Sequence, residues 1–210
     1  MPNVLVHKED TGGIRPRHPI LCAMDLLGLV VVVVMMRHFK PDFAVATLPL
    51  IVCGVYAASI IYHWLPYNRQ LHKADHQMIT LLTGLTFWSY WWVHLPTLQD
   101  PWRLPLMVVC TIVVCAFRWF WFKWHKVGGI LYLWLAAFPL TSSFNELQVW
   151  LPSPGIYLFW LGIFFYFVNF LIHTLQWPDP KPAFFGYRET QHIFVLASTW
   201  LQAYVAMKYL

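Results

Sequence analysis

Four stretches of the sequence carry polar side chains whose types and spacing could do chemistry. These side chains are Ser59 and His63, Asp75, Asn169 and His173, and Arg188, Glu189 and His192. The pairs separated by four residues would lie on one face of a helix and so point into the same space. Imidazole and carboxylate are ligands that zinc prefers, and a further carboxylate can steer a bound water. The pattern therefore predicts a candidate metal site, provided that these stretches meet.

The elements that must position these side chains are set by composition. Hydrophobic residues make up 59% of the 210-residue chain and charged residues only 11%, and the mean hydropathy is +0.54. Such a chain has lipid as its solvent. Apolar runs of about 20 residues, the length that crosses a bilayer, occur at 19–37, 43–65, 75–95, 103–123, 127–144, 154–176 and 187–209. We therefore expect an all-α integral membrane bundle of seven transmembrane helices, in which lipid forces even the β-branched run Val30 to Val34 into a helix.

The chain divides into a cytosolic N-terminal head, residues 1–18, and a seven-helix transmembrane domain, residues 19–210. Short breaks rich in proline, with glycine and aspartate, separate the runs and leave no room for a soluble domain. We expect no cleaved signal peptide, because the head mixes acids and bases and lacks a small-residue cleavage site. The four cysteines all fall inside predicted spans and should be reduced packing residues.

Orientation follows from the basic residues near the helix ends. With the N-terminus in the cytosol and the C-terminus outside, ten basic residues lie inside and four lie outside. The inside residues are Lys8, Arg15, Arg17, Arg69, Lys73, Arg118, Lys123, Lys126, Lys181 and Arg188. This asymmetry accounts for the pI near 9.1 by attraction to anionic lipid, so nucleic acid is not required as a partner. The compact loops favour a bacterial inner membrane.

In this orientation four helix ends converge on one cytosolic layer. His63 ends the second span, Asp75 lies in the first turn of the third, His173 ends the sixth, and His192 lies near the start of the seventh. Ionisable groups inside a membrane protein are costly and normally face the bundle interior. The layer is therefore the candidate functional site.

Each residue also has a simpler interpretation. His63 could stabilise a helix C-terminus, Ser59 could bond back to its own helix, and Asp75 could be an N-terminal charge or cap. His173 could be an interfacial histidine instead of a ligand. Asp25 is most simply a first-turn acid near the headgroups, with an inward-facing proton or pairing role as the alternative.

Three segments together resemble a known family. They are "SIIYH" (59–63), "ADHQMITLLTGLTFWS" (74–89) and "PDPKPAFFGYRETQHIFVLAS" (178–198). The chain resembles the hemolysin III family, which is related to the progestin and adiponectin receptors and to the alkaline ceramidases. The resemblance covers the seven-helix plan and is strongest over the second, third and seventh helices.

The resemblance implies a cytosolic zinc site with one histidine from the second helix and two, four residues apart, from the seventh. By motif position His63 and His192 are ligands, Ser59 is the serine partner and Asp75 steers water. Arg188 stands where the family has its first seventh-helix histidine, although Glu189 beside it keeps the pattern. A guanidinium has no lone pair for a metal and adds a positive charge one turn from His192.

Three consequences of Arg188 are open. It could turn toward the interface, leaving His63 and His192 to bind metal with Asp75 or with His173. It could pair with Asp75 in a metal-free bundle. It could also bind the phosphate or carboxylate of a lipid from the inner leaflet.

Two functions follow from these possibilities. One is a zinc-dependent hydrolase of lipid-like amides or esters, in which Asp75 handles the proton of water and Ser59 donates to the oxyanion. The alternative is a non-catalytic membrane-homeostasis or receptor-like protein that binds lipid. A pore has little support, because the sequence contains no ring of like charges and no glycine-rich filter.

Overall fold

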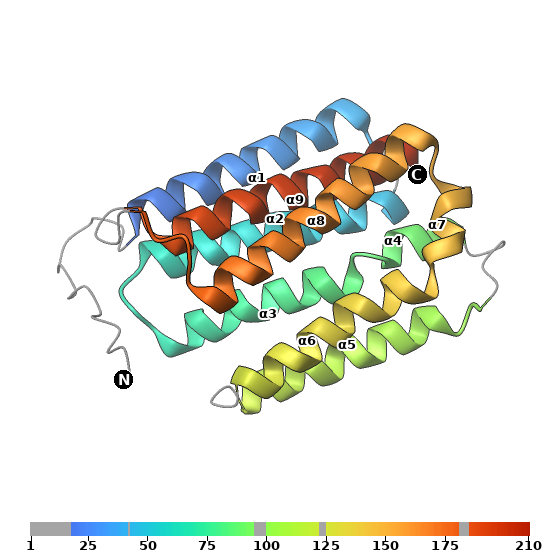
Figure 1. Cartoon of the computed structure of the whole chain (residues 1–210). Coiled ribbons are helices and arrows are strands. Elements are labelled where there is room, and N and C mark those ends of the chain that lie inside the picture. Colours follow the sequence, from blue (N-terminus) through green and yellow to red (C-terminus); the bar gives the residue numbers. More distant parts are fainter. Residues whose placement is uncertain (1–17, 42, 95–99, 122–124, 181–184) are drawn as a thin grey trace.

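A computed structural model describes residues 18–41, 43–94, 100–121, 125–180 and 185–210, and these form nine helices and no strand. The helices are α1 (Pro19–Phe39), α2 (Phe43–Trp64), α3 (Arg69–Leu85), α4 (Trp88–Val93), α5 (Arg103–Phe120), α6 (His125–Ser142), α7 (Phe144–Trp150), α8 (Ser153–Leu175) and α9 (Tyr187–Tyr209). Most of the predicted N-terminal head lies outside the described residues. Seven of the helices are long and run alongside one another as a bundle (Figure 1).

The all-helical, membrane-like fold class is confirmed. By length and composition, α1, α2, α5 and α8 could each cross a membrane. The stretch Val30 to Val34 is helical within α1, as expected for a chain in lipid. Two of these helices have a proline at their start: Pro19 begins α1, and Pro152 immediately precedes α8.

Two of the expected spans have different boundaries. The run 75–95 is divided into α3 and the short helix α4, and α3 starts earlier, at Arg69. The reason is a cap: the Asn68 side chain accepts hydrogen bonds from the backbone N–H groups of Gln70 and Leu71. Asp75 therefore lies beyond the first turn of its helix, which corrects the expectation from sequence. The run 127–144 corresponds to α6 and is followed by the additional short helix α7.

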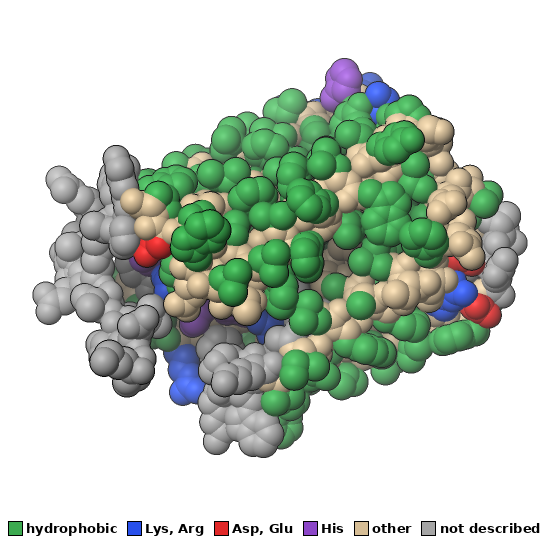
Figure 2. All heavy atoms as spheres, in the orientation of Figure 1, with side chains coloured by type: hydrophobic (Ala, Val, Ile, Leu, Met, Phe, Trp, Pro, Cys, Tyr) green, Lys and Arg blue, Asp and Glu red, His purple; other side chains and the backbone are tan. Residues whose placement is uncertain are grey.

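The outer faces of the long helices are apolar. On α1, Leu26, Val30 and Val34 are all more than half exposed, whereas the opposite face buries Leu21, Cys22, Asp25, Gly28 and Val32. Figure 2 shows hydrophobic side chains covering the visible side of the bundle, with charged side chains toward its ends. A polar residue inside and aliphatic residues outside is the arrangement that lipid favours.

The last helix, α9, lies between α1, α2 and α8 (Figure 1). The Ser198 hydroxyl donates to the Gly162 carbonyl oxygen (2.7 Å), and the Gln202 amide donates to the Phe159 carbonyl oxygen (3.0 Å). These bonds join α9 to α8 through buried side chains, as small and polar residues do between membrane helices. Gly28 lets α1 pack closely against α2 and α9. A Cβ at this position would stand only 2.6 Å from the Tyr56 ring of α2 and 2.7 Å from Leu196 of α9.

Candidate metal centre

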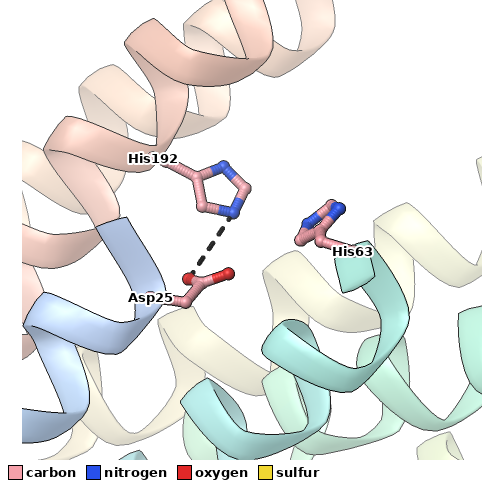
Figure 3. Close-up of side chains that lie close together, drawn as sticks. All are labelled: Asp25, His63 and His192. Carbon is pink, nitrogen blue, oxygen red and sulfur yellow. Dashed lines mark ion pairs between the residues drawn. The ribbon is translucent and has the colours of Figure 1, made fainter. Parts of the chain in front are cut away.

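Three side chains from three helices converge at the end of the bundle where α2 ends and α9 begins. Asp25 of α1, His63 of α2 and His192 of α9 point toward one another (Figure 3). Their potential ligand atoms all lie within 4.8 Å of one another, and His192 Nε2 is 3.9 Å from Asp25 Oδ1. The two imidazole rings meet edge to face with centroids 5.6 Å apart. We call these residues the Asp–His trio.

The first turn of α9 fixes the orientation of His192. Asp179 accepts a hydrogen bond from the Tyr187 N–H (3.0 Å), and Glu189 accepts one from the Gly186 N–H (2.8 Å). These carboxylates satisfy backbone groups where the helix begins. One turn later, His192 Nδ1 lies 3.0 Å from the Arg188 carbonyl oxygen. Because that carbonyl can only accept, Nδ1 carries the proton and Nε2 keeps its lone pair toward Asp25 and His63.

Asp25 brings a buried carboxylate to the trio. Its side chain is only 3% exposed, and Oδ2 has no hydrogen-bond donor in the described parts of the chain. Among the basic side chains there, only the imidazole of His192 lies near this carboxylate, with Nε2 3.9 Å from Oδ1, so no lysine or arginine neutralises it. Ser59, one turn before His63, lies close enough to Asp25 and Asp75 to act on both carboxylates. An acceptor left open beside two imidazoles is the environment that a cation would complete.

The donor set of the trio fits a divalent transition metal. Two imidazole nitrogens and one carboxylate oxygen are a common ligand set for zinc with a fourth position left open. In a tetrahedral zinc site with bonds of about 2.0–2.1 Å, ligand atoms are about 3.4 Å apart. The trio would therefore need to close by up to about 1.4 Å (4.8 − 3.4 Å). The Nδ1–H contact of His192 with a backbone carbonyl is also the support that metal-binding histidines usually have.

A second cluster of histidines lies on α3 and has a different arrangement. His72 and His76 are one turn apart, with their Nε2 atoms 3.0 Å from each other. Arg118 of α5 donates to Nδ1 of His76 (2.9 Å) and also to the Thr80 hydroxyl. Since Nδ1 of His76 accepts this bond, its Nε2 carries the proton. We call His72, His76 and Arg118 the Arg–His group.

The other predicted residues lie around the trio in distinct positions. Ser59 and Asp75 are buried next to it, and the charge of Arg118 acts on Asp75. His173 is exposed and lies 3.4 Å from the Gln191 side chain, outside the trio. Glu189 caps the start of α9.

Arg188 lies against its neighbour in sequence. Its guanidinium is 5.9 Å from the centre of the Tyr187 ring, and Nε donates to the Tyr187 hydroxyl (3.4 Å). The ion pairs among the described residues do not join it to Asp75. The backbone of Arg188 holds His192, while its side chain contributes a nearby positive charge.

Asp25 is the member of the trio that the sequence analysis did not identify as a candidate ligand. It lies beyond the first turn of α1 and faces inward, which corrects its interpretation as a first-turn acid and agrees with the alternative of an inward-facing role. A signal was present: Cys22, Asp25, Gly28 and Val32 repeat at helical spacing on one face, while the opposite face is purely aliphatic. His18 also lies close, and its backbone N–H donates to the His63 carbonyl oxygen (3.2 Å).

The described geometry thus contains a metal-compatible trio with a serine and a second carboxylate beside it. Neither a scan against models of known protein families nor searches of curated proteins and of solved structures found a match for this chain.

Proposed function

We propose that the chain crosses a membrane seven times, through α1, α2, α3 with α4, α5, α6, α8 and α9. The N-terminus lies in the cytosol, the C-terminus lies outside, and the membrane is a bacterial inner membrane. The lipid-facing aliphatic surface of α1 and the excess of basic residues at one end support this arrangement. Membrane lipids are then the immediate partners of the protein, and the Asp–His trio lies at the cytosolic end.

We further propose that the protein is a metal-dependent hydrolase of lipid-like amides or esters, with zinc as its metal. The observation that carries this proposal is the convergence of Asp25, His63 and His192 from three helices. Zinc held by these residues would supply Lewis-acid chemistry, which acidifies water and polarises a carbonyl group. Three protein ligands leave one position for water or substrate.

The protein's own residues account for the remaining chemical roles. Asp75, buried beside Ser59, takes the proton of the attacking water and returns it to the leaving group. The Ser59 hydroxyl donates a hydrogen bond to the oxygen that becomes negative during attack. The positive charge of Arg118 lies close enough to act on the Asp75 carboxylate electrostatically.

The resemblance to the hemolysin III family supports the same site, with one difference. Arg188 stands in place of a histidine ligand, and Asp25 supplies the third ligand atom from another helix. A non-catalytic lipid-binding or membrane-homeostasis role is the second candidate. The positive charge of Arg188 next to His192 favours it, because that charge opposes binding of a cation.

Metal analysis of the purified protein tests the proposal. We expect one zinc per chain in the unaltered protein and little or none in His63→Ala and His192→Ala. His173→Ala is the matched control: it removes an exposed imidazole outside the trio, so zinc should be retained. Metal-free protein after reconstitution with zinc, or equal loss in the His173 control, would contradict the site.

Hydrolysis of ceramide-like amides and simple lipid esters separates the two functions. In Asp75→Asn and Ser59→Ala we expect zinc to be retained while the turnover rate falls by roughly 10²–10⁴-fold and 10²-fold, respectively. A zinc-loaded protein that binds lipid but turns over none of these substrates would leave the non-catalytic role.

A further inference from the structure

At the opposite end of the bundle from the Asp–His trio, a cavity of about 510 Å³ opens beside α7. Both polar and apolar groups line the cavity. The lining includes His94, Asn145, Glu146, Val149 and Trp150. The His94 ring stacks flat on the Trp150 indole, with centroids 4.7 Å apart. This stacking gives the cavity a firm wall.

Only one of the two carboxylate oxygens of Glu146 has a hydrogen-bond donor in the described parts of the chain. Oε2 accepts a hydrogen bond from Arg103 (2.8 Å), whose guanidinium also donates to the Ser142 carbonyl oxygen and pairs with Asp100. Oε1 is buried and has no donor in the described ranges of the chain, and the Glu146 side chain is only 10% exposed. A buried carboxylate oxygen without a donor is costly unless a ligand completes it.

The charges around this oxygen favour a cationic ligand. One guanidinium faces two carboxylates, those of Asp100 and Glu146, so the group carries one surplus negative charge. The sequence offers no other charge nearby along the chain: only Asp100 and Arg103 occur between Asp75 and Arg118, and only Glu146 between Lys126 and Asp179. Figure 2 shows acidic and basic side chains next to each other at this end.

We propose that this cavity binds a primary ammonium group, which donates to Glu146 Oε1. The ammonium supplies both the missing hydrogen-bond donor and the missing positive charge. Apolar groups of the lining, among them Val149, which is 84% exposed, contact the carbon chain that carries the ammonium. A phosphatidylethanolamine headgroup and a free amine share this chemistry. The site is separate from the Asp–His trio and does not depend on its function.

Native mass spectrometry of the delipidated full-length protein tests the proposal. We expect phosphatidylethanolamine to bind at least tenfold more tightly than phosphatidylglycerol with the same acyl chains. Glu146→Gln should abolish this preference, whereas Glu189→Gln, the same change at the other end of the bundle, should keep it. Competition by millimolar ethanolamine would identify the ammonium alone as the ligand, and no competition would identify the intact lipid; both agree with the proposal.

A second variant, Val149→Lys, tests the proposal independently if Glu146→Gln fails to fold. Val149→Lys leaves the Arg103–Glu146 pair intact and places a primary ammonium on an exposed position one helical turn from Glu146. This internal ammonium should displace the ligand and remove the preference for phosphatidylethanolamine. Equal binding of the two lipids by the unaltered protein, or full preference retained in either variant, would overturn the proposal.

Discussion

The Asp–His trio and the Arg–His group both bring two imidazoles together near the same end of the bundle, yet they differ in the third member. The trio has a carboxylate with an open oxygen, and His192 turns a lone pair inward. The Arg–His group has a guanidinium that occupies a nitrogen of His76. Two neighbouring histidines are therefore not enough to indicate a metal site. The charge and hydrogen bonding of the neighbour decide whether lone pairs remain available.

Removing the carboxylate of Asp25 should have the largest effect on zinc binding. We expect Asp25→Asn to weaken zinc binding by roughly hundredfold, because a neutral amide replaces the charged ligand. His76→Ala, which removes an imidazole from the Arg–His group, should change zinc affinity less than threefold. Competition titration with a metal-sensitive dye measures both. Similar losses in the two variants would show that the Arg–His group also contributes to metal binding.

Removing the guanidinium should make the two groups more alike. In Arg118→Leu, Nδ1 of His76 is released, and the Nε2 atoms of His72 and His76, already 3.0 Å apart, become available as a pair of ligands. We expect a second, weaker zinc or nickel equivalent, with an affinity at least tenfold below that of the trio. The double variant Arg118→Leu/His72→Ala should return to one equivalent. A constant stoichiometry of one in all three proteins would refute this explanation.

Replacing Arg188 should strengthen metal binding by the trio. Arg188→His removes a positive charge that acts on His192 and adds an imidazole one turn away. We expect zinc affinity to rise about tenfold, the free-energy equivalent of about 1.4 kcal/mol. Isothermal titration against Arg188→Gln separates the two causes, because glutamine removes the charge and adds no imidazole. Unchanged affinity in both variants would mean that the side chain at this position has no influence on the site.

The smallest effect should come from packing. Gly28→Ala places a methyl group against Tyr56 and Leu196 and pushes α1, which carries Asp25, away from α2 and α9. We expect a loss of about 1–3 kcal/mol in stability and a zinc affinity a few-fold weaker. Thermal unfolding in detergent and the same dye titration measure these changes. Ala57→Gly, on α2, is a control for altered helix propensity, and an affinity loss as large as that of Gly28→Ala would remove packing as the explanation.

Much of the fold followed from simple physics. Apolar runs about as long as a bilayer is thick predicted the long helices. The ends were harder, because caps such as that of Asn68 act through single hydrogen bonds that hydropathy does not detect. This is why α3 begins at Arg69, and why Asp75 lies deeper in its helix than expected.

The sequence predicted a layer of polar residues at one end of the bundle. Which of these residues converge is known only from the structure. His63 and His192 stand out because charged and polar residues are rare in apolar runs. Asp25 is equally rare in such a run, but only the rotation of α1 decides whether it faces lipid, headgroups or its neighbours. That rotation depends on how Gly28 packs against Tyr56 and Leu196, which are far away in sequence.

The three side chains of the trio belong to the first, the second and the last helix of the described bundle. His192 follows His63 by 129 positions along the chain (192 − 63), so it is synthesised after helices α3 to α8. A truncated or stalled product without α9 would hold two of the three groups and none of the backbone support at Arg188. The proposed metal centre is therefore complete only after α9 has packed against α1 and α2.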